Sequence, residues 1–304
     1  LQDSGGGFDV LRFGAFITPA DVYVSQNRDS GDLIVGLRGT KDRVTVEGFF
    51  KADRFTGVFT NQIERIEFDD GSAWDLQQIL DRIEATPATA FDDDIHGTDV
   101  GETIDALGGS DSIQTYGGDD TVFAGDGDDF INAGDGNDLL YGGAGNDRFI
   151  GDPGDDRLYG GEGNDIFWGE GDGDDVVSGG PGDDSVLNWV GDDTYLYALG
   201  DEGQSIQDFS GYDRLVFGPG IGVADLAFSG DTGNPFATLS ITLAGNPGTI
   251  NLERWGGEGR IEEFVFADGT HLTADQVNAL AAGETVALDQ KPPVVNQPLP
   301  DRVR

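Results

Sequence analysis

Acidic residues recur at a fixed spacing through the middle of this chain. From Gly97 to Leu196 the sequence divides into eleven consecutive units of nine residues, one of which contains a tenth residue. The unit GGAGNDRFI, residues 142–150, shows the pattern: glycine stands at the fourth position, an acidic residue at the sixth and an apolar residue at the eighth. Carboxylates at such a regular spacing supply hard oxygen ligands, which favour a hard divalent cation. The pattern therefore predicts a series of metal sites.

The candidate ligands are the acidic residues at the sixth position and the glycines at the fourth, because backbone carbonyl oxygens of the turn can also bind a metal. The sixth position is Glu102 in the first unit and aspartate in all the others. The predicted carboxylate ligands are Asp111, Asp120, Asp129, Asp138, Asp147, Asp156, Asp165, Asp175, Asp184 and Asp193. The predicted site glycines are Gly118, Gly127, Gly136, Gly145, Gly154, Gly163 and Gly182.

The spacing also predicts the elements that position these residues. Glycine adopts a positive φ without steric cost, so the first six residues of a unit can form a tight turn with inward-pointing carbonyls. The last three can form a short strand whose middle, apolar side chain faces inward. Two units then complete one coil, and the acidic residues form two columns along the turns. One column runs from Glu102 through Asp120 to Asp193, and the other from Asp111 to Asp184.

The columns need a counterion. Carboxylates stacked about one strand spacing apart, ~4.8 Å, repel one another unless a cation lies between them. Calcium accepts roughly 6 to 8 oxygens with flexible geometry, whereas magnesium demands a tighter octahedron and retains water. Calcium is therefore the predicted cofactor, and pairing each unit with the next but one predicts roughly 6 to 9 ions. Val100 and Glu102 weaken the pattern of the first unit, and the tenth residue within 169–178 is expected to distort one site.

The repeat is not expected to fold without the metal. Each unit buries one apolar side chain in register, which cannot offset the conformational entropy of ordering about nine residues. The acidic residues add charge repulsion to that cost. We therefore expect the segment to be largely unfolded without calcium, with binding and folding occurring as one event.

The composition limits the classes of partner. The 304 residues carry a formal net charge of −41, which disfavours binding to nucleic acid and to anionic membranes. The absence of cysteine excludes disulfides and thiolate zinc sites. No apolar run is long enough to cross a membrane as a helix, and the N-terminus lacks the pattern of a signal peptide. Because the chain contains no methionine, we expect it to be a piece of a longer protein.

The nine-residue unit resembles the G-G-x-G-x-D-x-U-x consensus of RTX (repeats-in-toxin) proteins, as residues 142–149 show. The resemblance implies an all-β protein with a right-handed parallel β-roll and with calcium in its turns. It also implies a bacterial protein that leaves the cell through a type I secretion machinery and folds in extracellular calcium. The implied location is secreted or at the cell surface.

The regions on either side of the repeat resemble each other. Residues 9–22 align with 213–226, and residues 63–74 align with 261–272. Alternating segments between these anchors predict antiparallel strands, and each copy ends in a predicted short helix. Both copies resemble the haemolysin-type calcium-binding-related module. The predicted domains are therefore a flanking module at 1–90, the roll at 91–196, a capping module at 197–286 and a proline-rich linker at 287–304.

The ends of a roll expose apolar core and unpaired strand edges, which require a cap. The second copy follows the repeat directly and is assigned that role. By the same logic the first copy is expected to cap an earlier roll upstream of Leu1. The tail KPPVVNQPLPDRVR resembles the opening strand of cadherin-like repeats, as found in large bacterial surface proteins.

Other interpretations fit the sequence less well. A disordered linker would not keep eleven apolar residues in register, a phosphate-binding loop would need G-K-[ST], and no EF-hand loop occurs. His96 and His271 are predicted to be structural or exposed. Trp168 and Trp189 are predicted to pack on an outer face or at the cap, with contact to a sugar as the alternative.

The sequence shows no nucleophile paired with a base that would indicate an enzyme. The main hypothesis is therefore a non-enzymatic calcium-binding block that stabilises or spaces parts of a secreted protein. One alternative is a recognition segment of an adhesin or toxin, with a host-cell receptor, a glycan or a surface as its ligand. Another is a non-catalytic accessory module of a secreted exoenzyme.

Overall fold

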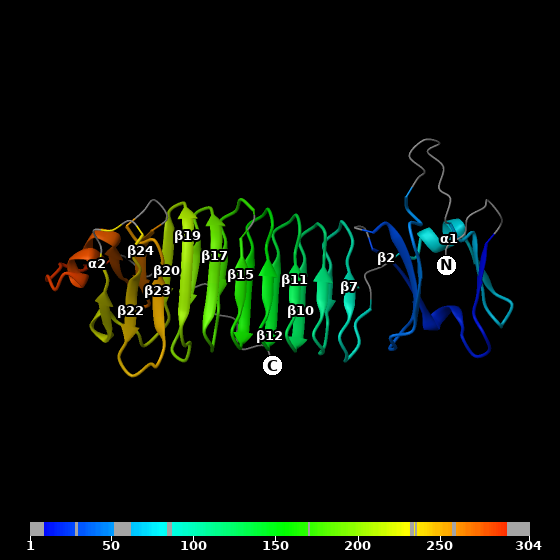
Figure 1. Cartoon of the computed structure of the whole chain (residues 1–304), viewed down its shortest axis with the longest axis horizontal. Helices are drawn as coiled ribbons and strands as arrows, with labels where there is room; N and C mark the ends of the chain where they lie inside the picture. Colours follow the sequence, from blue (N-terminus) through cyan, green and yellow to red (C-terminus); the bar gives the residue numbers. More distant parts are fainter. Residues whose placement is uncertain are drawn as a thin grey trace.

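Strands dominate the structure and form an elongated stack with a smaller unit at its start (Figure 1). The computed structural model describes residues 9–27, 30–51, 62–83, 87–169, 171–231, 234, 236–256 and 260–290. The predicted all-β class with a parallel β-roll is confirmed. Residues 291–304, which include most of the predicted proline-rich linker, and the side chain of Trp189 lie outside the described part of the chain.

Two parallel sheets face each other in the roll. One contains β7 (Asp94–His96), β9 (Ser112–Gln114), β11 (Phe130–Asn132), β13 (Arg148–Ile150), β15 (Ile166–Trp168) and β17 (Asp184–Val190). The other contains β8 (Thr103–Asp105), β10 (Thr121–Asp126), β12 (Leu139–Ala144), β14 (Arg157–Glu162), β16 (Val176–Ser178) and β18 (Thr194–Tyr197). Val122 lies opposite Leu140, and Leu140 opposite Leu158. Two units therefore make one coil, as the spacing predicted.

The apolar residues at the eighth position form the core between the two sheets. Ile131, Leu140 and Phe149 are all 0 % exposed. Phe149 stacks on Phe167 of the next coil, with ring centroids 4.7 Å apart. One continuous hydrophobic core runs from Ile95 through the roll and into the C-terminal region. Burial in this core fixes the register, because a shift by one residue would turn every apolar side chain outward.

The C-terminal region continues both sheets. Its strands are β19 (Gln204–Ser210), β20 (Asp213–Phe217), β21 (Leu226–Ser229), β22 (Leu239–Leu243), β23 (Thr249–Leu252), β24 (Ile261–Phe266), β25 (Thr270–Thr273) and β26 (Asp289–Gln290). β19 and β20 stack in parallel on β17 and β18, and β23 and β24 stack in parallel on β19 and β20. The parallel stacking thus extends beyond Leu196, where the repeat was expected to end.

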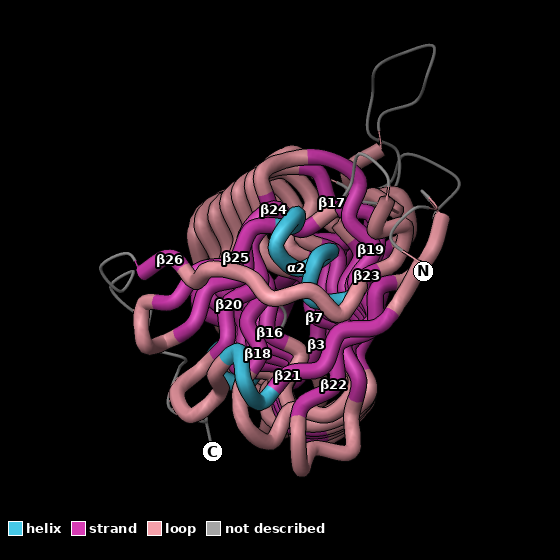
Figure 2. Tube along the Cα trace, turned by 90° about the vertical axis from the view of Figure 1, so that its left-hand side faces the viewer, coloured by secondary structure: helices cyan, strands magenta, loops and turns pink. Residues whose placement is uncertain are grey.

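Antiparallel strands and a helix complete this region. β21 and β22 pair beside β23, while β25 and β26 pair beside β24. A short 3-10 helix, η2 (Val223–Asp225), precedes β21. Helix α2 (Ala274–Ala281) lies across the end of the two sheets and buries Val277 in the common core (Figure 2).

The N-terminal module has a hydrophobic core of its own. Its elements are β1 (Val10–Arg12), the 3-10 helix η1 (Pro19–Asp21), β2 (Val22–Asn27), β3 (Asp32–Leu37), β4 (Arg43–Val46), β5 (Arg65–Glu67), β6 (Ala73–Asp75) and α1 (Leu76–Leu80). β2 contacts β7, the first strand of the roll. Asn27 Nδ2 lies 3.1 Å from His96 Nε2, and an Arg43 nitrogen lies 4.0 Å from Asp94 Oδ2. The module therefore meets the start of this roll.

The two flanking regions share one topology. β1 pairs in parallel with β5, as β20 does with β24. The antiparallel sheet β2–β3–β4 corresponds to β21–β22–β23. α1 and α2 both begin at a capping box, with Asp75 and Thr273 as the N-caps. The internal resemblance of the sequence thus extends to strand order and pairing.

Candidate metal centre

The sixth-position aspartates are buried side chains at the turns of the roll. Each lies at the start of a strand: Asp138 comes directly before β12 and Asp147 directly before β13, while Asp184 is the first residue of β17. All aspartates of one column therefore stand at the start of strands that belong to the same sheet. The exposed fraction of these ten side chains is between 0 and 5 %, as given by Asp129 and Asp175. Buried carboxylates are unusual unless they are paired or bind a metal.

One oxygen of each carboxylate is used by the fold. The backbone N–H of Asp120 donates to Asp138 Oδ1 at 2.7 Å, and the N–H of Asp138 donates to Asp156 Oδ1 at 2.8 Å. The same bond links successive coils along both columns, with lengths between 2.7 and 3.0 Å. We call these two rows of bonds the inner ladders. They fix the position of every carboxylate relative to the preceding coil.

The other oxygen is buried without a hydrogen-bond partner in nine of the ten sixth-position aspartates, Asp175 being the exception, and also in Asp213. These unpartnered, buried Oδ2 atoms belong to Asp111, Asp120, Asp129, Asp138, Asp147, Asp156, Asp165, Asp184, Asp193 and Asp213. A buried carboxylate oxygen without a partner carries the full cost of losing water. A row of them is the donor set that a hard divalent cation requires. The orphaned oxygens therefore fit calcium.

The glycines leave space around these oxygens. A Cβ atom at Gly142 would collide with Asp147 Oδ2 and would lie 2.7 Å from the carbonyl oxygen of Gly160 on the next coil. A Cβ at Gly160 would collide in the same way with Asp165 Oδ2. Glycine at the first position thus keeps open a corner where a carboxylate oxygen and a backbone carbonyl come together. That corner can accept a cation.

The fourth-position glycines serve the turn itself. Gly118, Gly145 and Gly163 have φ values of +103°, +143° and +130°, which are strained for any residue with a side chain. A Cβ at Gly145 would collide with the carbonyl oxygen of Gly127, the equivalent glycine of the preceding coil. The same holds for Gly154 over Gly136 and for Gly182 over Gly163. The predicted site glycines therefore form stacked turns whose carbonyl groups approach the next coil.

The electrostatics of the columns favour a bound cation. Loss of water on burial, with added repulsion from neighbouring carboxylates, raises the pKa of Asp138 to about 7, of Asp184 to about 8 and of Asp156 to about 9. Backbone N–H donors oppose this increase and do not cancel it. Near neutral pH the metal-free columns must therefore hold protons or bear unfavourable charge. A divalent cation removes that cost.

The irregular units keep the inner ladder. Across the unit with the tenth residue, the N–H of Asp156 donates to Asp175 Oδ1 at 2.8 Å. The expected distortion therefore leaves this bond intact. In the first unit, Glu102 Oε2 accepts from the N–H of Thr98 at 2.7 Å, so its longer side chain turns back onto its own unit. Its backbone N–H still donates to Asp120 Oδ1.

A second set of side-chain bonds was missed at the sequence level. The fifth-position Asp and Asn side chains accept from the backbone of the next coil, as Asp119 Oδ1 does from Asn137 N–H at 3.0 Å. Asn137 in turn accepts from Asp155 N–H at 2.8 Å. These outer bonds run opposite in direction to the inner ladders. The signal was the recurrence of Asp or Asn directly before the sixth-position aspartate.

Asp213 was also missed. It continues the inner ladder, because its Oδ1 accepts from Asp193 N–H at 3.0 Å. The stretch Gly211–Leu215 keeps glycine, acid and apolar residue in the spacing of the repeat, and this spacing could have identified it. His96 and His271 lie outside the columns: each is 5 % exposed, and His271 Nδ1 lies 2.8 Å from Glu263 Oε1.

Comparison with known families finds matches for the repeat and for both flanking regions. The RTX calcium-binding nonapeptide repeat (4 copies) matches residues 96–131, 116–149, 123–156, 141–172 and 171–195. The haemolysin-type calcium binding protein related domain matches residues 32–78 and 239–276. A search of curated proteins found no match. Within the described residues, no helix has the length and apolar character needed to cross a membrane. The middle of this chain is therefore an RTX calcium-binding β-roll, and both regions that flank it contain haemolysin-type calcium-binding-related domains.

Proposed function

We propose that this chain is a non-enzymatic calcium-binding block of a secreted bacterial protein, and that calcium drives its folding. The observation that supports this most directly is the two columns of buried aspartates, nine of whose ten sixth-position members have one buried oxygen without a partner. The calcium-free roll would have to bury these charges without compensation. Binding the metal and closing the coils therefore belong to one equilibrium.

The ions would lie in the turns. The ligands proposed are the ten sixth-position aspartates from Asp111 to Asp193, together with backbone carbonyls of the turn glycines. When bound, calcium supplies positive charge and accepts additional oxygen donors. With carboxylates paired between successive coils, we propose roughly 6 to 9 ions.

The flanking domains complete the block. We infer that residues 197–286 cap the roll, since α2 and the antiparallel strands cover the core beyond β20. RTX repeats occur in secreted proteins, and calcium is scarce in the cytoplasm. A chain that remains unfolded until it meets extracellular calcium suits export through a type I secretion machinery. Outside the cell, the folded roll would serve as a stiff spacer.

A calcium titration followed by far-UV circular dichroism tests this proposal, with magnesium as the control. We expect a cooperative gain of β-structure at roughly 0.1 to 1 mM calcium, the range of extracellular modules, and little response to magnesium. A chain that shows the full β-spectrum in metal-free buffer at neutral pH, unchanged by added calcium, would refute it.

A further inference from the structure

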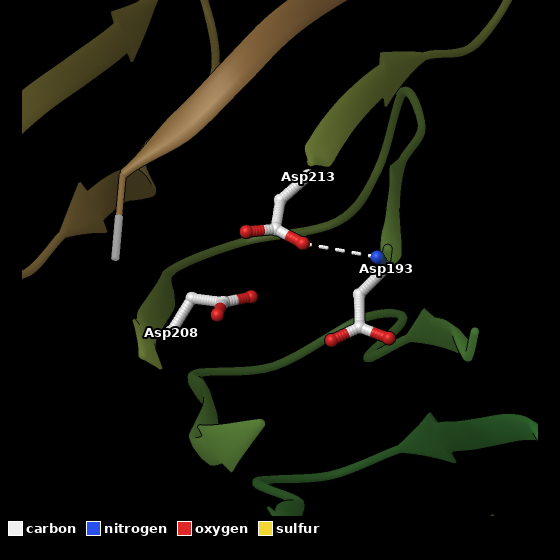
Figure 3. A group of neighbouring side chains, drawn as sticks. All are labelled: Asp193, Asp208 and Asp213. Atoms are coloured by element: carbon white, nitrogen blue, oxygen red, sulfur yellow. Dashed lines mark hydrogen bonds between the residues drawn. The ribbon is translucent and has the colours of Figure 1, made fainter. Parts of the chain in front are cut away.

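Three carboxylates converge where the repeat meets the C-terminal region. Asp193 precedes β18, Asp208 lies in β19 and Asp213 begins β20. One carboxylate oxygen from each lies within 4.8 Å of the others. The three side chains are 0, 2 and 0 % exposed, and Figure 3 shows them facing a common space.

Asp208 does not belong to the inner ladder. It stands five residues before Asp213, in the place that Gly142 holds relative to Asp147 and that Gly160 holds relative to Asp165. In those units glycine keeps the corner beside the aspartate oxygen open. Here the corner receives a third carboxylate. The site therefore carries one more negative charge than the pair of aspartates that the repeat provides.

The hydrogen bonds leave oxygens available for a ligand. Asp193 and Asp213 each use Oδ1 as an acceptor for the preceding coil, at 2.9 and 3.0 Å, and the Oδ2 atom of each is buried without a partner. Asp208 is oriented by the Tyr195 hydroxyl, which donates to Oδ2, and by the N–H of Ser210, which donates to Oδ1 at 3.1 Å. The backbone of Phe209 also donates to this carboxylate. A carboxylate offers about four acceptor positions, so Asp208 keeps one for a cation.

The C-terminal region supplies the last acceptor of this inner ladder. Glu262, in β24, accepts from the N–H of Asp213 at 2.9 Å and so takes the place of a further repeat aspartate. The N-terminal module contains the same bond, because Asp9 N–H donates to Glu64 Oε2 at 2.7 Å. Asp213 and its glutamate are thus a recurring feature of the flanking domain.

We propose that Asp193, Asp208 and Asp213 form a calcium site of their own, shared between the last repeat and the cap and tighter than the repeat sites. Three buried carboxylates favour a hard divalent cation, and calcium affinity rises with the number of charged ligands and with the rigidity of the site. This site rests on the proposed function for the identity of its ion. It adds Asp208, a ligand outside the repeat pattern.

The test is a calorimetric calcium titration of the full 304-residue chain and of three variants. Asp208→Asn removes the third charge with little change in volume. Asp208→Gly restores the residue of the equivalent repeat units, which fold with glycine there. Asp192→Asn is the matched control, because Asp192 lies in the same turn, is exposed and accepts from Tyr212 N–H at 2.8 Å.

We expect the tightest calcium-binding step to weaken on the order of tenfold in both Asp208 variants and to be retained in Asp192→Asn. Should Asp208→Asn fail to fold, Asp208→Gly still gives the answer. If the tightest step persists unchanged in a folded Asp208 variant, the site is wrong while the proposed function stands. If the unaltered chain binds no calcium, the proposed function itself fails.

Discussion

Each sixth-position aspartate divides its carboxylate between two tasks. Asp147 Oδ1 accepts from the N–H of Asp129 at 2.9 Å, whereas Asp147 Oδ2 is buried without a partner. The first oxygen joins two coils and the second remains for a metal. An amide in place of the carboxylate can keep the first task, because its carbonyl oxygen still accepts. Substitution by asparagine therefore weakens metal binding while the hydrogen bond between the two coils is kept.

For Asp147→Asn we expect the calcium midpoint of folding to rise several-fold, because one charged ligand is lost from the middle of a column. At saturating calcium the circular dichroism spectrum should match that of the original chain. The control is Asp128→Asn, an exposed residue at the fifth position whose side chain accepts from Asn146 N–H at 2.8 Å. Equal midpoints for the two variants would contradict the assignment of Asp147 as a ligand.

Two adjacent glycines allow a test of backbone strain. Gly118 has φ +103°, and a Cβ there would lie 2.5 Å from the carbonyl carbon of Val100. Gly117 is under no such strain, and its Cβ would make contacts of 3.4 Å or longer. We expect Gly118→Ala to lower the free energy of unfolding in saturating calcium by about 2 kcal/mol, and Gly117→Ala by less than about 1 kcal/mol. Urea denaturation measures the free energy of unfolding of both variants. A larger loss in Gly117→Ala than in Gly118→Ala would disprove the role of Gly118 in the turn.

At the scale of elements, the C-terminal region and the roll share one core. Tyr195 of β18, Leu215 of β20 and Phe264 of β24 lie side by side in adjacent parallel strands and are at most 1 % exposed. The C-terminal region therefore covers the last coil by extending its sheets, as expected of the proposed cap. Without β19 and β20, the edges of β17 and β18 and the side chain of Tyr195 would face water.

A stop after Leu196 should therefore raise the calcium midpoint and cause aggregation, because unpaired edges and apolar core become exposed. Circular dichroism and size-exclusion chromatography measure these effects. A stop after Gln290 keeps every strand that the structure describes and is the control. If the shorter chain folds as a monomer at an unchanged midpoint, residues 197–286 do not act as the cap.

The repeat was predictable from the sequence because its constraints are local. The positions of Asp147, Gly145 and Phe149 within one unit predict the buried carboxylate, the turn and the core side chain, and the period predicts which strands become neighbours. The flanking strands were predictable from alternation, and their pairing only from the structure. Asp208 stands five residues before Asp213, where the repeat has glycine, but this spacing does not show that an aspartate there accepts from Tyr195 and lies near Asp193.

At the scale of the whole molecule, the proposed function implies that protons and calcium compete for the same carboxylates. Burial raises the pKa of the column aspartates, for example to about 6 for Asp120 and about 9 for Asp156, against about 3.9 in an unfolded chain. The metal-free folded roll therefore binds more protons than the unfolded chain. Stability from this source is fully present below about pH 4 and is lost as the pH rises through the range of about 6 to 9.

In metal-free buffer we therefore expect β-structure to increase as the pH falls from 8 to 5. Hydrogen bonds lower the pKa of Asp21, Asp70 and Asp268, whose ordinary values already lie below this window, so they add no opposing change. In the presence of calcium the trend should reverse, since protons displace the metal. Circular dichroism at fixed calcium activity follows both cases, and a metal-free spectrum that is constant from pH 8 to 5 would contradict the raised pKa values.

The inner ladders connect each coil only to the coil before and the coil after it, through bonds between residues that are 18 apart in the regular units. The number of coils can therefore change without disturbing the contacts within the remaining coils. Duplication of 18 residues would insert a complete coil, extend the rod by about 4.8 Å and leave every existing site unaltered. Duplication of nine residues would instead add half a coil, so that every later strand would move to the opposite sheet. Growth and shortening by whole coils are thus the steps by which such a rod can be adjusted to the distance it must span.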